Sequence, residues 1–207
     1  MVGPVHENVT ALCQSLASRI SAVHVSAADA LRTVAAGNSG DAEAARAALE
    51  HGTLAPDEVV IRAVKNALSD PRVRTHGYVL QGFPRTAAQA QAIATLGIAP
   101  VGRVIVLEMD NNAVKDRLLA QRWDPTARCF YNLIDTAPPA AVQKRLVTLP
   151  ANQPEAVERR MQAAATAAVT VKTAFPSISR IIDGRADRRR TLELMISFVE
   201  NPLPSSI

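Results

Sequence analysis

Short apolar runs alternate along the chain with longer segments in which apolar residues recur every three or four positions. A nearly continuous apolar run is typical of a strand buried on both faces, and the wider spacing is typical of an amphipathic helix. The pattern predicts strands at 22–26, 78–81, 104–108 and 178–183. It predicts helices at 8–20, 27–36, 41–51, 56–68, 87–96, 112–122, 154–173 and 188–200. This alternation favours an α/β fold with a doubly wound parallel sheet, in which ligands bind beyond the carboxyl ends of the strands.

One segment, 123–154, departs from this alternation. It carries five prolines and shows no convincing periodicity of either kind. A long irregular segment inside a compact domain usually serves as a lid or a binding loop. We therefore expect 123–154 to cover a site rather than to form part of the core.

The composition is that of a folded protein with few aromatic residues. Of the 207 residues, 48% are hydrophobic, 20% are charged and only 3% are aromatic, which excludes wholesale disorder and predicts a core of small aliphatic side chains. Cys13 and Cys129 are too few for a disulfide scaffold or a four-thiolate zinc site, so we expect two reduced thiols and no metal centre. Neither a signal sequence nor a membrane span is evident, and the pattern favours a cytoplasmic protein that does not contact membranes.

Positive charge is carried almost entirely by arginine. The net charge is +4, and lysine occurs only at Lys65, Lys115, Lys144 and Lys172. A basic protein raises the question of nucleic acid as a partner. The densest arginine cluster, at 185–190, adjoins Asp183 and Asp187 and has no aromatic neighbours that would stack on bases. We interpret it as a solvated helix start and do not expect nucleic acid to bind there.

The most specific motif is Gly-Phe-Pro-Arg-Thr at 82–86, directly after a predicted strand. Gly82 allows a backbone to approach a ligand closely, Arg85 can grip a phosphate with two donors, and Gln89 can read a base edge. The segment 77–90 resembles the strand–loop–helix signature of adenylate kinases and related nucleoside monophosphate kinases.

Further segments resemble the same family in the same order. They are 26–32, which ends in Arg32, the turn 52–58, the helix 116–122, and the lid pieces 124–128, 131–133 and 138–139. The lid pieces are similar to those of adenylate-kinase-like domains in ciliary proteins. The resemblance covers nearly the whole chain, 1–207.

The resemblance implies a fold and a monophosphate site. It implies a parallel core (1–25, 70–122 and 155–207), a helical flap that binds the monophosphate (26–69) and a lid (123–154). An AMP-type nucleotide would be held by Arg32, Gly82, Arg85 and Gln89, and Arg117 and Arg160 would bridge the transferring phosphates. Each arginine on its own would be interpreted as an ordinary solvated side chain. Because six residues match the family motifs in the same order, we favour a binding site.

The site for the phosphate donor departs from the family pattern. A P-loop reads G-x-x-x-x-G-K-[ST], so that backbone amides and a lysine hold the ATP phosphates and a hydroxyl holds magnesium. Residues 3–10 keep only Gly3 and Thr10, with Asn8 in place of the second glycine and Val9 in place of the lysine. No shift of register restores the motif, because the first lysine in the chain is Lys65.

Other donor-side positions depart as well. Gln81 stands where a carboxylate would organise magnesium, and Gln121 and Leu149 stand where lid arginines are expected. Each lost donor typically lowers the rate of phosphoryl transfer about 100- to 1,000-fold. We therefore expect ATP to bind weakly or not at all, and Mg²⁺ to be a cofactor only if the protein is active.

The strand that should precede the P-loop is almost absent. Only Met1 and Val2 come before Gly3, so the central first strand is predicted to be truncated or missing. The strands on either side would then keep unpaired backbone groups, each at a cost of about 1 to 3 kcal/mol. A longer parent protein, a shortened strand and a partner that fills the gap remain open as explanations.

Three functions are consistent with these residues. We favour a nucleotide-binding or scaffolding module with impaired kinase chemistry, with a protein assembly as partner and, by family analogy, the cilium or flagellum as a location beside the cytoplasm. The first alternative is a working kinase that transfers a phosphoryl group reversibly from ATP to AMP. The second is a purely structural, axonemal component that binds no nucleotide.

Overall fold

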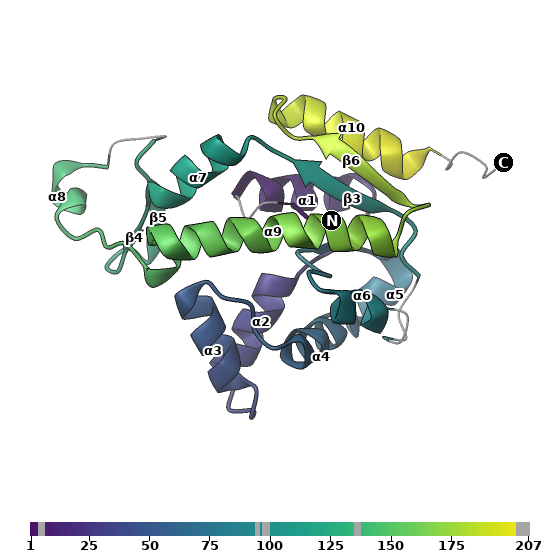
Figure 1. Ribbon diagram of the computed structural model, residues 1–207, viewed down its shortest axis with the longest axis horizontal. Helices are drawn as coiled ribbons and strands as arrows, with labels where there is room; N and C mark the ends of the chain where they lie inside the picture. The colour runs from purple at the N-terminus through teal and green to yellow at the C-terminus, as the bar shows by residue number, and fades with distance from the viewer. Residues whose placement is uncertain (4–6, 94–95, 97–99, 135–137, 202–207) are drawn as a thin grey trace.

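A computed structural model describes residues 1–3, 7–93, 96, 100–134 and 138–201, and the side chains of Glu7 and Asn8 lie outside this description. Figure 1 shows the long helix α9 (Pro154–Ala174) crossing the middle of the molecule. Helix α10 (Arg188–Glu200) lies at the top of that view, and α2, α3 and α4 lie below α9.

Four short strands form two parallel pairs. β1 (Val23–Ser26) pairs with β2 (Tyr78–Gln81), and β3 (Val104–Glu108) pairs with β6 (Ser179–Asp183). Each predicted strand is confirmed to within one residue, which is the usual uncertainty of an element boundary. The expected α/β fold with parallel strands is therefore confirmed.

The first two residues lie between these pairs and join them. The nitrogen of Met1 donates to the carbonyl of Leu80, and the amide of Gly82 donates to the carbonyl of Met1 at 3.0 Å. On the other side, the amide of Val2 donates to the carbonyl of Ile105, and the carbonyl of Val2 accepts from the amide of Leu107, both at 2.9 Å. Val2 forms a parallel bridge with β3, so the strand order is β1, β2, the Met1–Val2 segment, β3 and β6. In the described residues, Met1 and Val2 alone occupy the centre of the sheet.

Helices cover both faces of the strands. Ile105 and Leu107 of β3 pack in one cluster with residues of α1 (Glu7–Arg19) and α10. Val104 and Val106 pack in another cluster with residues of α9. Because successive side chains of a strand point to opposite faces, this division confirms the doubly wound arrangement.

The helices α2 (Ala27–Ala36), α3 (Ala42–His51) and α4 (Asp57–Leu68) pack together beside β1 and β2. Buried alanines, among them Ala45 and Ala48, allow α3 to approach its neighbours closely. α3 ends at Gly52, which has the left-handed φ of 65° that glycine adopts without strain.

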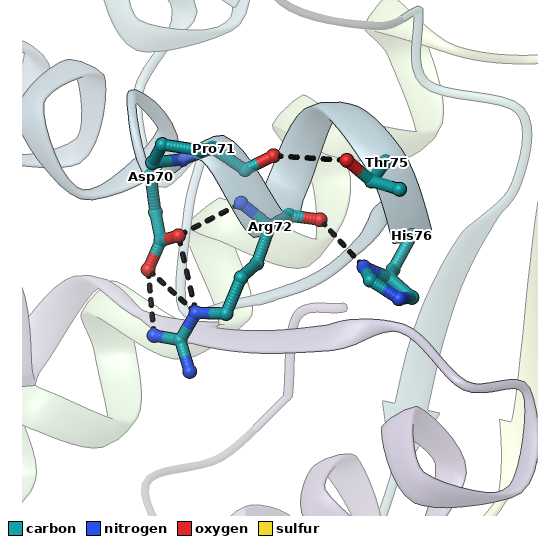
Figure 2. Close-up of polar contacts among 5 residues, drawn as sticks. All are labelled: Asp70, Pro71, Arg72, Thr75 and His76. Atoms are coloured by element: carbon teal, nitrogen blue, oxygen red, sulfur yellow. Dashed lines mark hydrogen bonds and ion pairs between the residues drawn. The ribbon is translucent and has the colours of Figure 1, made fainter.

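A short helix that the hydrophobic pattern did not predict, α5 (Pro71–His76), leads into β2. Figure 2 shows how Asp70 caps it: the carboxylate accepts from the backbone amide of Arg72 at 2.9 Å and from the Arg72 guanidinium at 2.6 Å. Pro71 occupies the first turn, where its missing N–H is harmless. In the sequence, the pair Asp70-Pro71 is typical of a helix start and could have indicated this helix.

Two helix predictions need correction. The helix expected at 112–122 is α7 (Asn111–Leu119), which ends early because β4 (Gln121–Asp124) begins there. The helix expected at 87–96 is α6 (Ala87–Ile93), and residues 94–95 lie outside the described part.

The expectation of an irregular lid segment was wrong in part. β4 pairs with β5 (Cys129–Asn132) as an antiparallel hairpin, followed by α8 (Ala140–Gln143) and the 3₁₀ turn η1 (Pro150–Asn152). Of the helices described, none is long and apolar enough to cross a membrane.

An ion pair between a buried aspartate and a partly exposed arginine holds the hairpin to the chain that follows it. The side chain of Asp124 is fully buried and accepts from Arg145 at 2.7 Å and from the backbone amides of Thr126 and Ala127. The bond from Arg145, ahead of the backbone bonds, lowers the pKa of Asp124 to about 2. A pKa below that of an unfolded aspartate means that this carboxylate stabilises the folded lid when ionised.

We expect Asp124→Asn to lower the melting temperature by several degrees, because a neutral amide in this fully buried position would lose the charge-assisted hydrogen bonds from Arg145. Asp183→Asn is the matched control: the pKa of Asp183 is also lowered to about 2, by Arg185, but that pair is exposed and should matter little. In the wild type, the contribution of Asp124 is complete above the pKa of an unfolded aspartate, about 3.9, and is lost as the pH falls towards 2. Thermal melts from pH 6 to pH 2 check this, and equal losses for the two variants would contradict it.

Candidate functional site

The chain turns sharply at the carboxyl end of β2. Gly82 has a φ of 76°, in the left-handed region where a side chain would be strained. Its amide is bound to Met1, and its carbonyl accepts from the Nε of Arg85 at 3.1 Å. The glycine thus anchors the arginine of the motif at the edge of the strands where ligands bind in such folds.

Gln89 is buried and both ends of its amide are engaged. Its Oε1 accepts from the backbone amide of Arg85 at 2.8 Å, and its Nε2 donates to Asp57 at 2.8 Å. Because Asp57 begins α4, this side chain ties the 82–89 loop to the helices 27–68. Contact of Gln89 with a base stays a prediction, and it would require exchange of the bond to Asp57.

Two arginines lie close enough to repel each other. Burial lowers the pKa of Arg85, and burial followed by repulsion from Arg85 lowers the pKa of Arg160. Their described side-chain hydrogen bonds go to the carbonyls of Gly82 and Ala151, and within the described residues neither guanidinium meets a carboxylate. Two neighbouring cations in a poorly hydrated place favour an anion between or beside them.

The turn at Gly52 lies against Arg160. A Cβ added at Gly52 would lie 3.1 Å from the Cδ of Arg160 and 3.0 Å from the Cβ of Ala151. The turn at the end of α3 therefore packs closely against Ala151 and Arg160. A residue larger than glycine at position 52 would fit only if these neighbours moved.

Four of the six predicted residues lie close to one another. Gly82, Arg85 and Gln89 are joined by hydrogen bonds, and Arg160 is within electrostatic range of Arg85. Arg32 is exposed and forms an ion pair with Asp29 of the same helix. Arg117 is half-buried on α7, a helix that packs against α9.

The structure describes only part of the predicted donor site. α1 begins at Glu7, so Asn8, Val9 and Thr10 lie in its first turns, and residues 4–6 lie outside the described part. Val9, which stands where the lysine is needed, is 4% exposed and belongs to the core. Gly3 lies against β3, where an added Cβ would come within 3.1 Å of the Cβ of Leu107.

The hydroxyl expected to hold magnesium is already engaged. Thr10 Oγ1 accepts from the side-chain amide of Gln81 at 2.9 Å, and the Oε1 of Gln81 lies 2.9 Å from the Nε2 of His24. Magnesium prefers carboxylate, phosphate and water oxygens in octahedral geometry. Across the described residues, no group of three histidine, cysteine or acidic side chains comes together. Of the described side chains predicted to organise magnesium, Thr10 and Gln81 bring no negative charge and are bonded to each other.

Polar residues outside the matched motifs also form hydrogen bonds that join separate elements. Asn152 is buried and donates to the side chain of Gln121 and to the carbonyl of Leu118, both at 3.0 Å, which fixes η1 to the end of α7. The sequence analysis missed Asn152 and His24, which carry no motif. Asp57 did lie in a matched segment, but nothing in its spacing indicated the bond to Gln89.

The arginine cluster near the C-terminal helix makes ordinary surface contacts. Arg185 pairs with Asp183, while Arg189 and Arg190 pair with Glu193. These pairs support the interpretation of a solvated helix start.

A parallel α/β core with an arginine-lined loop after its second strand is the architecture of a nucleoside monophosphate kinase, and comparison with known proteins makes the family explicit. The adenylate kinase family model matches residues 2–177, so the chain belongs to the adenylate kinase family. The resemblance identified from the sequence is confirmed.

Individual relatives agree with this assignment. Human adenylate kinase 8 is 26% identical over 208 aligned positions, which cover 100% of this chain and 43% of the relative. Adenylate kinase 8 of Xenopus tropicalis is 25% identical over 205 positions, 99% of this chain and 42% of the relative. A probable chloroplastic adenylate kinase 2 of Oryza sativa subsp. japonica is 36% identical over 121 positions, 58% of this chain and 41% of the relative. The chain thus spans about half the length, or less, of these curated relatives.

We expect that placing the missing lysine back will not restore a donor site by itself. Val9→Lys puts a cation into the core, so we expect the melting temperature to fall by about 5 °C or more. Affinity for ATP should not improve. Gln14→Lys, on the exposed side of the same helix, is the matched control and should change the melting temperature by no more than about 2 °C. Tighter ATP binding by Val9→Lys without loss of stability would show that our placement of this side chain is wrong.

Proposed function

We propose that this chain is a nucleotide-binding module that keeps a site for a nucleoside monophosphate and has lost the site for the phosphoryl donor. The ligand is an AMP-type nucleotide, and phosphoryl transfer from ATP is weak or absent. The proposal carries forward the sequence prediction of a monophosphate site at Arg32, Gly82, Arg85 and Gln89, with Arg117 and Arg160 beside the phosphates.

One observation supports the monophosphate site above the others. Arg85 and Arg160 are mutually repulsive, partly desolvated cations without a described carboxylate partner. Burying such charges is costly unless an anion compensates them. A monophosphate supplies two negative charges and several acceptor oxygens, which suits a guanidinium pair.

The flap (26–69) and the lid (123–154) would each cover part of the bound nucleotide. The helices of 26–69 would close over the base and sugar, with Asp57 and Gln89 as the contact between flap and loop. The hairpin and turn of 123–154 would act as the lid, anchored by Asp124 and Arg145.

The loss of donor chemistry is supported by three positions. Val9 lies in the core, Thr10 is held by Gln81, and Gln81 brings no negative charge for a metal. Phosphoryl transfer depends on positioning and charge neutralisation at the transferred phosphate, and these positions supply neither. A scaffolding role in a protein assembly, and a cytoplasmic or ciliary location, are further expectations that rest on the family resemblance alone.

Calorimetric titration with AMP tests the monophosphate site. We expect measurable binding to the wild type and at least about tenfold weaker binding to Arg85→Ala, because hydrogen bonds to a charged ligand are lost. Arg159→Ala is the matched control, since Arg159 is exposed and adjacent to Arg160 on α9. Absence of any heat from the wild type would favour the purely structural alternative, and equal weakening by both variants would overturn the site.

A coupled assay for ADP formation tests the loss of the donor site. With ATP, AMP and Mg²⁺ at high protein concentration, we expect no turnover above background. Each missing donor group typically lowers the rate of phosphoryl transfer about 100- to 1,000-fold. Even if another residue compensated for one of these groups, little activity should remain. Clear magnesium-dependent turnover that Arg85→Ala abolishes would establish the working kinase instead.

A further inference from the structure

Strand β6 lies at the end of the strand order, where β3 pairs with one of its two edges (Figure 1). The amide of Val104 donates to the carbonyl of Ile178 at 2.9 Å, and the amide of Gly184 donates to the carbonyl of Glu108 at 2.7 Å. Alternate residues of such a strand direct their backbone groups to opposite sides. Residues 178, 180, 182 and 184 therefore bond towards β3, and the backbone groups of residues 179, 181 and 183 point away from it.

The outward edge of β6 has no partner among the residues that the structure describes. In this part of the chain, no hydrogen bond is recorded for the amides of Ser179, Ile181 or Asp183. The side chain of Ile181 is 49% exposed, although most apolar side chains in the parallel strands are buried. An exposed strand edge that carries an apolar residue is a template for pairing with another extended segment.

The two faces of this edge differ in chemistry. Ile181 lies beside Val106 in the register with β3, and Val106 packs with residues of α9, so Ile181 belongs to the α9 face. Arg180 belongs to the α10 face, where its guanidinium lies 5.7 Å from the centre of the Phe198 ring. The edge therefore presents an apolar side chain on one face and a cation on the other.

The charge of Arg180 is not balanced by a described neighbour. Arg180 is exposed, and across the described ranges its side chain has no recorded ion pair or hydrogen bond. Arg103, the other arginine over the Phe198 ring, donates instead to the carbonyls of Gly102, Phe198 and Asn201. A carboxylate on a strand added beside β6 would pair with the free guanidinium, because side chains on one face of adjacent strands are neighbours.

We propose that the outer edge of β6 is a docking site for an extended peptide segment in which apolar and acidic residues alternate. The segment would add a sixth strand to the sheet through the outward backbone groups of Ser179, Ile181 and Asp183. Because successive side chains of a strand point to opposite faces, its apolar residues would lie beside Ile181 and its acidic residues beside Arg180. This docking site does not rest on the proposed function.

The charge of Arg180 decides between the possible occupants of the edge. A second copy of this chain, paired through its own β6, would bring a second Arg180 to the same face, and like charges on adjacent strands weaken pairing. A wholly apolar segment would cover Ile181 but leave the guanidinium without a partner. An alternating apolar and acidic segment satisfies both side chains and the backbone groups.

Hydrogen exchange of the 207-residue chain, followed at single amides by NMR, tests the proposal with an acetylated Glu-Val-Glu-Val-Glu-Val-Glu amide as the probe. When the peptide saturates the chain, we expect exchange at the amides of Ile181 and Asp183 to slow at least about tenfold, because these amides then donate to the peptide. The amides of Arg180 and Ile182 already bond towards β3 and serve as an internal control. Their exchange should change by less than about twofold.

A second peptide and two variants test the role of charge. A Lys-Val-Lys-Val-Lys-Val-Lys peptide should bind at least about fivefold more weakly than the acidic peptide, because its lysines would lie beside Arg180. Arg180→Gln should weaken binding of the acidic peptide about three- to fivefold. Arg159→Gln is the matched control, since Arg159 is an exposed arginine of α9, and it should leave the affinity unchanged.

The proposal fails on any of three results. Unchanged exchange at Ile181 and Asp183 at every peptide concentration would show that the edge does not accept a strand. Equal affinity for the acidic and basic peptides would show that Arg180 does not select the segment. Slower exchange at the same two amides in the peptide-free chain as its own concentration rises would assign the edge to a second copy.

Discussion

The structure depends on the hydrogen bonds that two residues make with strands on either side. Met1 bonds to Leu80 and Gly82, Val2 bonds to Ile105 and Leu107, and these bonds join the β1–β2 pair to the β3–β6 pair. On one face, α1 packs against β1 and β2 while α10 packs against β6, and on the other face α9 packs against β3 and β6. Without the Met1–Val2 segment, two-stranded parallel sheets would have to stand alone, which such small sheets rarely do.

The same segment also positions the loop that carries Gly82 and Arg85. Through Met1 it fixes the amide of Gly82, whose carbonyl holds Arg85 at the edge where a monophosphate would bind. Beyond Gly3 the chain enters α1, which packs Val9 into the core, and Gln81 bonds to Thr10. Under the proposed function, the monophosphate half of the family site would keep its positive charge at Arg85 and Arg160. The donor half would be lost, because Val9 packs in the core and Thr10 is bonded to Gln81.

The sequence predicted those parts of the molecule that local pattern controls. The strands were recognisable as buried apolar runs, and Gly82, Arg85 and Gln89 through their resemblance to a family motif. The hairpin of 121–132 was missed because most of its side chains are partly or fully exposed and because Asp124 is bonded to Arg145, 21 residues away. The partners of Gln89 and Thr10 were missed for the same reason: hydrogen bonds between distant side chains leave no periodic signal.

The central claim is that one half of the nucleotide site is kept and the other is lost. A dinucleotide with two adenosines joined by five phosphates measures both halves at once, because it can occupy the monophosphate and donor sites together. In a calorimetric competition with AMP, the account predicts that this compound binds no more tightly than AMP itself, since only one of its ends finds a site. Binding more than about tenfold tighter than AMP, a gain of about 1.4 kcal/mol, would show that the donor half still holds phosphate and would contradict the account.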